Sequence, residues 1–246
     1  MCRMLTFDLP EVRCSLLGTK EDEKIALAVL GGKAPDPAWL KQLPDWPVFC
    51  ADRGAEYATS VGRKVDLLVG DQDSADRHIY NKVKGEGGRV AVHPSEKDFT
   101  DTQLLLREIE KEPCHLVVAG AFGGRLDHLQ SNLRSLINYK KTTGRQVLLA
   151  DGEETLVLLR AGESCVLRFE TEDLPIISFL PFEQGSRVSG TNLKWAVENF
   201  LLSLENPNAI SNVLLAGECK IKCDAGMIGV YLYKESRKKD GIYSNL

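Results

Sequence analysis

The chain has 246 residues, of which 43% are hydrophobic and 27% charged, and its 31 basic and 35 acidic side chains give a net charge of −4. This length and composition allow one large core or two modest ones, which excludes an intrinsically disordered protein. The slight acidity provides no general attraction for nucleic acid or an anionic membrane. The longest uninterrupted apolar run, residues 25–30, is far shorter than the ~20 residues of a membrane-spanning helix. We therefore expect a soluble, cytoplasmic protein without nucleic-acid or membrane partners.

The cysteines indicate packing rather than disulfides or metal binding. There are seven, an odd number, and they lack the regular spacing of a disulfide-rich secreted domain. Cys219 and Cys223 are four residues apart in an alternating segment, so they face the same side of a predicted strand. No second pair of thiol or histidine ligands completes a zinc site beside them. We expect buried, reduced thiols.

Short apolar runs alternate with helix-like segments in the first half of the chain. Such runs are typical of strands covered on both faces, and they lie at residues 24–30, 48–51, 67–69, 89–92, 116–119 and 147–150. Helical spacing occurs between them, at residues 102–111 and in the segment after Gly124, which ends before a candidate C-cap at Gly144. Residues 1–150 therefore predict an α/β domain with a mostly parallel sheet flanked by helices.

After residue 150 the pattern changes to short alternating or apolar runs between Gly, Pro, Asn and Asp turns. The predicted strands are residues 155–159, 165–169, 176–180, 213–216 and 227–233. No long helical repeat is present. We expect an all-β sandwich domain over residues 151–246, with a solvated tail from Glu235 onward.

Acidic side chains follow three of the predicted parallel strands. They are Asp52, Asp71, Asp73, Asp98 and Asp101. Open parallel sheets bind ligands at this edge, and clustered carboxylates repel one another unless a cation lies among them. Hard oxygen ligands suit Mg²⁺, so a divalent metal site is one interpretation. The alternative is structural, because Asp-x-Asp is common in loops and Asp98 or Asp101 can cap the helix that follows.

The loop at residues 120–128 joins a predicted strand to the best-defined helix and contains a pair of glycines before Arg125. Backbone N–H groups at a helix N-terminus can bind an anion, and an arginine can form paired bonds to phosphate oxygens. The alternative to a phosphate site is a tight turn with Arg125 in solvent and Asp127 in the first helical turn. His128 fits a structural role, since no Ser-His-Asp arrangement includes it. The sequences G-x-x-x-x-G-K-[ST] and G-x-G-x-x-G are both absent.

Taken in order, six short motifs resemble the thiamine pyrophosphokinase family. They are DRGA from Asp52, GDQDS from Gly70, KDFTD from Lys97, GGRLDH from Gly123, SGTNLKW from Ser189 and ISN from Ile210. Each motif is weak alone. Their order is specific, because the predicted change from α/β to all-β falls between the fourth and the fifth. The resemblance covers most of the chain, from residue 25 to residue 233.

The resemblance implies an enzyme that transfers the pyrophosphoryl group of ATP to the hydroxyl of thiamine, giving thiamine diphosphate and AMP. It also implies Mg²⁺ and a homodimer whose active sites lie between the α/β domain of one subunit and the β domain of the other. By position in the motifs, the metal ligands would be Asp71, Asp73 and Asp98, which with Arg125 would form the catalytic group. The nucleotide would contact Asp52, Gly54, Lys97, Asp101, Gly124 and Arg125. Thiamine would contact Asp127, Ser189 and Trp195, although without the resemblance Trp195 fits a core aromatic.

The sequence departs from the family pattern at Arg53, Glu56, Gln72, Phe99 and Asn192. Asn192 replaces a glycine, but asparagine can still adopt a positive φ. One alternative function is a pyrophosphokinase of the same fold acting on a hydroxymethylpterin. Another is a catalytically silent nucleotide- or thiamine-binding protein, with Arg53 and Glu56 marking a degraded site. The retained metal-motif carboxylates argue for activity, and Ser189 and Trp195 argue for thiamine.

Overall fold

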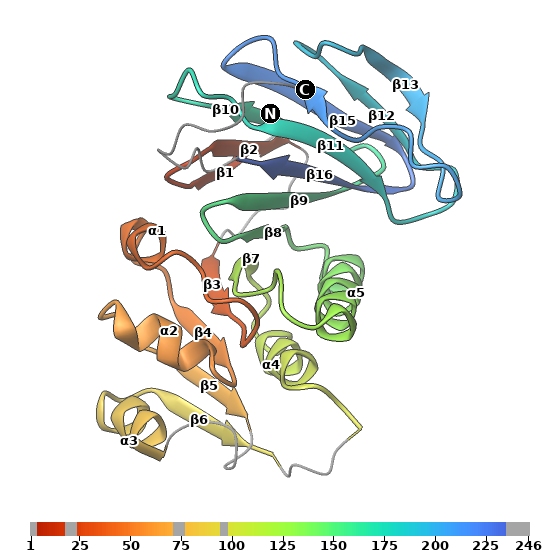
Figure 1. The fold of residues 1–246 in the computed structure, drawn as a ribbon. Coiled ribbons are helices and arrows are strands. Elements are labelled where there is room, and N and C mark those ends of the chain that lie inside the picture. The colour runs from red at the N-terminus through yellow and green to blue at the C-terminus, as the bar shows by residue number, and fades with distance from the viewer. Residues whose placement is uncertain (1–3, 18–23, 71–76, 94–97, 235–246) are drawn as a thin grey trace.

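A computed structural model describes residues 4–17, 24–70, 77–93 and 98–234, and these residues form two β-sheets and five helices (Figure 1). The helices are α1 (Pro37–Gln42), α2 (Gly54–Ser60), α3 (Arg77–Gly85), α4 (Asp101–Ile109) and α5 (Leu126–Thr143). The parallel strands are β3 (Ile25–Val29), β4 (Val48–Ala51), β5 (Leu67–Gly70), β6 (Arg89–Val92), β7 (His115–Ala119) and β8 (Val147–Ala150). The antiparallel strands are β1 (Met4–Asp8), β2 (Arg13–Leu17), β9 (Glu154–Arg160), β10 (Ser164–Arg168), β11 (Ile176–Pro181), β12 (Arg187–Gly190), β13 (Val197–Leu201), β14 (Asn212–Val213), β15 (Glu218–Ala225) and β16 (Met227–Tyr233).

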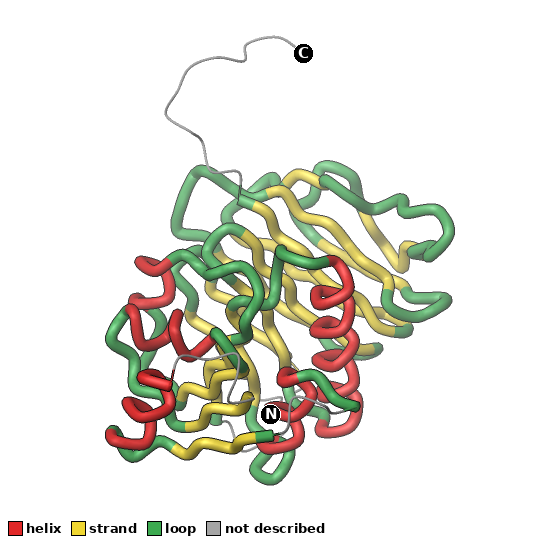
Figure 2. Tube along the Cα trace, turned by 60° about the horizontal axis from the view of Figure 1, so that its bottom comes forward, coloured by secondary structure: helices red, strands yellow, loops and turns green. Residues whose placement is uncertain are grey.

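The parallel strands lie in the order β8-β7-β3-β4-β5-β6. Each coincides with an apolar run of the sequence. Helices cover both faces, with α1, α2 and α3 on one side and α4 and α5 on the other (Figures 1 and 2). Alternate residues of β3 accordingly point to opposite cores, Leu27 and Val29 to the first and Ala26 and Ala28 to the second. The strand order reverses between β3 and β7, since the chain moves outward from β3 to β6 and then returns to β7.

The sheet continues past the parallel strands without a break. β9 pairs antiparallel with β8, and β16, β11 and β14 follow. The ten-stranded sheet is therefore mixed, and the expected mostly parallel arrangement applies only to its first six strands. The change of pattern at residue 150 coincides with this change of strand direction. The division into residues 1–150 and 151–246 stays a prediction, because one sheet runs through it.

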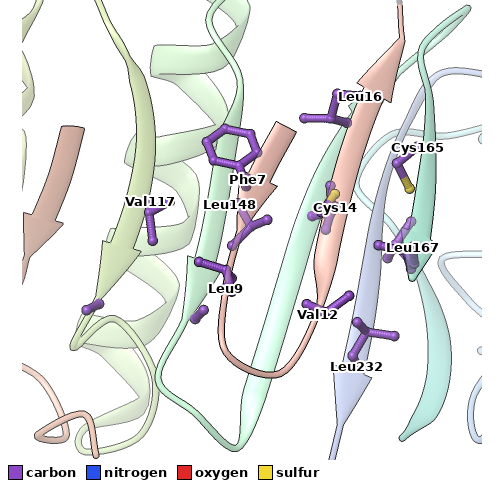
Figure 3. Packing of buried hydrophobic residues seen from close by; sticks show 14 of the residues in the cluster. Phe7, Leu9, Val12, Cys14, Leu16, Val117, Leu148, Cys165, Leu167 and Leu232 are labelled. Carbon is purple, nitrogen blue, oxygen red and sulfur yellow. The ribbon is translucent and has the colours of Figure 1, made fainter. Parts of the chain in front are cut away.

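The six-stranded sheet, in the order β1-β2-β10-β15-β12-β13, completes a β-sandwich with the antiparallel half of the larger sheet. Its first two strands are an N-terminal hairpin that the sequence analysis did not predict, and β2 pairs with β10. Phe7 and Leu9 of this hairpin belong to the same buried cluster as Leu148 of β8 and Leu167 of β10 (Figure 3). The hairpin therefore links the sandwich to the parallel strands.

Two helix boundaries follow directly from the sequence. α5 ends at Gly144, whose φ of 71° is the left-handed conformation expected of a C-cap. At the start of α4, Thr100 is the N-cap and forms a capping box with Gln103. The capping role considered for Asp98 and Asp101 is thus wrong, although Asp101 does lie in the first turn beside the positive end of the helix dipole.

The described cysteines are buried free thiols, and Cys219 and Cys223 both face the core from β15, as predicted. None of the helices in the described part of the chain combines the length and the apolar character needed to cross a membrane.

His115, at the start of β7, is a buried titratable group with only 1% of its surface exposed. Its Nδ1 accepts a hydrogen bond from the backbone N–H of Gln146 at 2.8 Å. Burial and the nearby positive charges of Arg145 and Lys140 lower the pKa of His115 from 6.5 to about 4. The native protein therefore holds this imidazole neutral.

We predict that acidification destabilises the fold through His115. The unfolded chain binds a proton at this residue below a pH of about 6.5, whereas the folded chain does so only near its lowered pKa of about 4. The contribution of the neutral imidazole to the free energy of unfolding is therefore fully present above pH of about 6.5 and is lost as the pH falls from there toward about 4. Between pH of about 6.5 and about 5 the loss from this group is about 2 kcal/mol. Urea unfolding of the wild type and His115→Gln at both pH values measures it. A variant with the same pH-dependent loss as the wild type would refute the assignment.

Candidate functional site

A cleft of about 800 Å³ opens at the carboxyl ends of β3, β4 and β7. Its walls are the loops after these strands and the first turns of α4 and α5, at residues 31–33, 51–53, 100–102, 123–125, 127–128 and 131–132. This is the point where the strand order reverses. Open α/β sheets bind their ligands at such a point, because the loops from the two sides diverge there and leave a crevice.

Glycines bring the two central loops of the cleft into contact. The backbone N–H of Gly32 donates to the carbonyl oxygen of Gly120 at 2.9 Å, and that of Lys33 donates to Phe122 at 3.1 Å. A Cβ added to Gly32 would lie 2.4 Å from the Gly120 oxygen, and Gly120 itself has a φ of +67°. The loops after β3 and β7 can therefore approach this closely only with glycine at both positions.

Asp52 follows β4 in a strained conformation. Its φ of 56° is uncommon outside glycine, and its backbone N–H donates to Val69 at 2.9 Å. This conformation places the carboxylate beside the loop after β3, since a Cβ on Gly31 would be 3.5 Å from Asp52 Oδ2. Strained residues held by their surroundings concentrate at functional sites, so Asp52 is a strong candidate for ligand contact.

Arg125 and Asp127 form a paired salt bridge at the N-terminus of α5. Arg125 Nη2 lies 2.6 Å from Asp127 Oδ2, and Arg125 Nε lies 3.1 Å from Asp127 Oδ1. These bonds are the main cause of the lowered pKa of Asp127, and the backbone N–H of His128 adds a further bond at 2.9 Å. Both side chains are exposed, so the pair contributes little stability and can exchange partners readily.

A buried hydrogen bond of 2.8 Å joins α4 to α5 at the wall of the cleft, from Thr102 Oγ1 to Asn132 Oδ1. The sequence analysis missed both residues, and it also missed Lys33. Asn132 carried a usable signal, because it lies three residues after Leu129 and four before Leu136 on the apolar face of the helix. A polar side chain on that face requires a buried partner.

The structure brings several of the predicted nucleotide and thiamine residues together in this cleft: Asp52, Asp101, Gly124, Arg125 and Asp127. Gly54 begins α2, where a Cβ would lie 2.0 Å from the carbonyl oxygen of Val29. Close packing against β3 therefore explains why this position is a glycine. Asp98 is exposed in the bend before α4 and does not line the cleft. The predicted residues Asp71, Asp73 and Lys97 lie outside the described residues, as does Gln72.

Metal binding is not tested by this geometry. Within residues 4–17, 24–70, 77–93 and 98–234, no three acidic, histidine or cysteine side chains are grouped closely enough to hold an ion. Two of the three predicted ligands fall outside these ranges. The assignment of Asp71, Asp73 and Asp98 to a metal therefore stays a prediction.

Ser189 lies on β12 in a network of charged side chains. Its Oγ lies 2.5 Å from Asp224 Oδ2 and accepts a bond from the backbone N–H of Asn199 at 2.8 Å. Burial opposes ionisation of Asp224, but the bonds from Lys222 and Ser189 lower its pKa overall. The hydroxyl of Ser189 is thus oriented by an ionised carboxylate.

Trp195 lies in the loop between β12 and β13, and 55% of its surface is exposed. The interpretation of this residue as a core aromatic is therefore wrong. Lys194 Nζ lies 4.9 Å from the centroid of the indole, within the range of a cation–π contact. Trp195 and Ser189 are both absent from the walls of the cleft. In Figure 1, β12 and β13 lie at the opposite end of the molecule from β5.

The departures at Arg53, Glu56, Phe99 and Asn192, which lie among the described residues, have local contacts or conformations that accommodate them. Arg53 Nε lies 4.0 Å from Glu56 Oε2, so these two residues form an exposed pair with each other. The guanidinium of Arg107 lies 3.6 Å above the ring of Phe99. Asn192 has a φ of 58°, which confirms that asparagine provides the left-handed conformation expected of the glycine it replaces.

These features define an α/β protein whose switch-point cleft carries Arg125 at a helix N-terminus, with Trp195 exposed separately on a β-sandwich. The model of the family "Thiamin pyrophosphokinase, catalytic domain" matches residues 43–148, and that of "Thiamin pyrophosphokinase, vitamin B1 binding domain" matches residues 164–228. The chain belongs to the thiamin pyrophosphokinase family. This membership favours neither the pterin enzyme nor the silent binding protein.

Individual relatives agree with the family. Thiamine pyrophosphokinase of Bacillus subtilis is 29% identical over 67% of this chain and 76% of its own length. Thiamine pyrophosphokinase 1 of rice is 26% identical over 67% of this chain and 65% of its own length. A solved structure of the B. subtilis protein has a TM-score of 0.74 at 22% identity, with 86% of this chain and all of that chain covered. A solved structure of a thiamin pyrophosphokinase family protein from Enterococcus faecalis has a TM-score of 0.69 at 26% identity, with 87% of this chain and all of that chain covered.

We predict that Gly32→Ala separates the two central loops and destabilises the protein by about 2 kcal/mol, because its Cβ meets backbone rather than a flexible side chain. Gly62→Ala is the matched control, since Gly62 has a φ of +80° and nothing within 4 Å of an added Cβ. It should cost about 1 kcal/mol through backbone strain alone. Urea unfolding measures both, and equal losses would refute the contact between the loops.

Proposed function

We propose that this protein transfers the pyrophosphoryl group of ATP to the hydroxyl of thiamine, giving thiamine diphosphate and AMP. The observation that carries the proposal is the cleft at the strand-order reversal, where Asp52, Asp101, Arg125 and Asp127 meet within the matched catalytic domain. The cysteines among the described residues are buried free thiols, which suit a reducing compartment and support a cytoplasmic location.

The nucleotide side of the site uses positioning and charge. Attack at the β-phosphorus builds negative charge on the phosphate oxygens, so cationic groups held in place stabilise the transition state. Arg125 precedes the first turn of α5, where backbone N–H groups and the helix dipole also favour an anion. In this proposal the guanidinium moves from Asp127 to the phosphates, which leaves the Asp127 carboxylate for thiamine.

The chemistry of the predicted donors fits Mg²⁺, since Asp71, Asp73 and Asp98 offer hard carboxylate oxygens. Asp98, the one described member of this set, is exposed next to the N-cap of α4 and is therefore accessible to an ion. When bound, Mg²⁺ would neutralise charge on the triphosphate. We propose these three residues as its ligands.

The thiamine side needs an aromatic surface and a carboxylate, because thiamine has a cationic thiazolium and a flat aminopyrimidine. Trp195 offers an exposed indole, and Asp127 is ionised because Arg125 and the start of α5 lower its pKa. Ser189 offers a hydroxyl oriented by Asp224. These properties support the three residues as thiamine contacts.

A homodimer would unite the two sides. Ser189 and Trp195 do not line the cleft of their own chain, so we propose that the partner subunit supplies them. The segment after Trp195 is rich in exposed apolar side chains, namely Leu201, Leu204, Ile210, Val213 and Leu215, which are 39–64% exposed. Apolar surface of this kind favours burial against another subunit.

We predict thiamine-dependent release of AMP by the purified protein with ATP and Mg²⁺. Parallel reactions with a hydroxymethylpterin and with no acceptor are the controls. Thiamine diphosphate should form in amounts equal to AMP. Release of AMP with the pterin and not with thiamine would make the pterin the substrate. No release of AMP under any condition would favour the silent binding protein.

We predict that two inactive variants restore activity when they are co-expressed. Asp73→Asn removes a proposed metal ligand, and Trp195→Ala removes the proposed thiamine surface of the other subunit. A heterodimer then has one site with both changes and one unchanged site, so a random mixture should regain about a quarter of wild-type activity at subsaturating thiamine. If each site came from a single chain, no mixture would exceed the separate variants.

A further inference from the structure

Asn212 closes the ISN motif and is buried, with 5% of its surface exposed. Its side chain bonds to both polar groups of the Trp195 backbone. Asn212 Oδ1 accepts from the Trp195 N–H at 3.1 Å, and Asn212 Nδ2 donates to the Trp195 carbonyl oxygen at 2.7 Å. The same Oδ1 also accepts from the N–H of Val213 at 2.8 Å. A single amide thereby fixes the backbone on both sides of the Trp195 Cα atom.

These bonds extend a short backbone ladder. Leu193 and Leu214 form an isolated antiparallel bridge, Lys194 N donates to Val213 O at 2.9 Å, and Leu215 N donates to Asn192 O at 2.8 Å. The pairing reaches only as far as Val213, and the side chain of Asn212 takes the place of the next backbone partner.

Ser211 sets the direction of the chain at Asn212, where the pairing with Trp195 begins. It has a positive φ of 58°, and its N–H donates to Ser178 Oγ of β11 at 2.9 Å. The turn at Ser211 is thus anchored to the larger sheet before the chain reaches Asn212. The backbone of Trp195 is in this way tied to a strand of the sandwich and not only to its own loop.

We propose that Asn212 is a positioning residue for the thiamine site, which holds the Trp195 backbone so that the exposed indole starts from one fixed Cα position and direction. The proposal rests on the proposed function, in which Trp195 stacks on thiamine. An aromatic side chain that is 55% exposed is placed little by packing, so the fixed backbone sets where its Cα–Cβ bond points and which rotamers reach the ligand. Binding is tighter when the stacking surface is ordered before the ligand arrives.

The two bonds between the Asn212 side chain and the Trp195 backbone form what we call the clamp. Amide hydrogen exchange of ¹⁵N-tryptophan-labelled protein tests it without any ligand. In Asn212→Ala the Trp195 amide should exchange at least about tenfold faster than in the wild type, since it loses its acceptor. The Trp39 amide is an internal control, because it donates to Asp36 Oδ1 at 2.8 Å and should not change. Unchanged exchange at Trp195 would overturn the proposal, and so would equal acceleration at both amides.

Steady-state kinetics test the consequence for thiamine. The KM for thiamine should rise about tenfold in Asn212→Ala while the KM for ATP stays within about twofold. Asn212→Asp keeps the Oδ1 acceptor of the Trp195 N–H but turns a second oxygen toward the Trp195 carbonyl. The Trp195 amide should therefore exchange more slowly in this variant than in Asn212→Ala, and the variant also serves if the alanine variant folds poorly. Ser15→Ala is the control for a general loss of stability, because Ser15 is 1% exposed and bonds to Thr6 on the hairpin.

Equal changes in both KM values would assign Asn212 a purely structural role and overturn the proposal. A wild-type protein without thiamine-dependent AMP release would instead refute the proposed function, and the exchange rate of the Trp195 amide would still confirm or refute the clamp.

Discussion

The close contact between the loops after β3 and β7 is the constraint on which the site depends. The two strands are neighbours in the sheet, but the chain leaves them in opposite directions, so their loops form the floor of the cleft. Gly32 and Gly120 allow backbone-to-backbone contact there, and the contact fixes where Lys33 and Arg125 can reach. The rest of the cleft is arranged around this floor by α4 and α5.

The lysine and arginine side chains of the described cleft walls each have a carboxylate neighbour. Arg125 pairs with Asp127, and Lys33 Nζ lies 3.0 Å from Glu153 Oε2. These pairs are exposed and therefore weak, so a polyphosphate can take over the cations at little cost. The same pairs keep the cleft nearly balanced in charge. An anionic ligand that binds Arg125 and Lys33 would free their carboxylate partners to face a cation. A site for a triphosphate and a cationic second substrate needs both kinds of charge in this way.

The sequence was sufficient to predict those parts of the fold that depend on local pattern. The parallel strands are apolar runs of their own, and α5 has both its helical period and its terminal Gly144 within one segment. The N-terminal hairpin could not be placed, although Leu5 and Phe7 alternate with polar residues, because its partner strand β10 lies far along the chain. Pairing between distant segments leaves no mark in local periodicity.

The same division holds within the site. The position of Asp52 and Asp101 at one edge follows from the rule that parallel strands end together, and that part was predicted. The left-handed backbone of Asp52 arises from tertiary contacts, so no local pattern reports it. The apolar face of α5 indicates that Asn132 needs a buried partner, but only the packing of α4 on α5 identifies that partner as Thr102. Asp98 also follows the rule for strand ends but lies in the bend before α4, since the rule locates a loop and not the direction of its side chains.

The unbroken ten-stranded sheet restricts how the site can be completed. Leu148, Leu149 and Ala150 of β8 pair directly with β9, and the hairpin packs across the same junction. Hinge closure between the parallel strands and the sandwich would break this pairing and expose the shared core, which costs far more than an exposed interface gains. A hinge motion of this kind therefore does not bring Trp195 into the cleft of its own chain. In the proposed homodimer, a second subunit would bring another Trp195 to that cleft without disturbing either sheet, so the unbroken sheet is compatible with the proposed shared site.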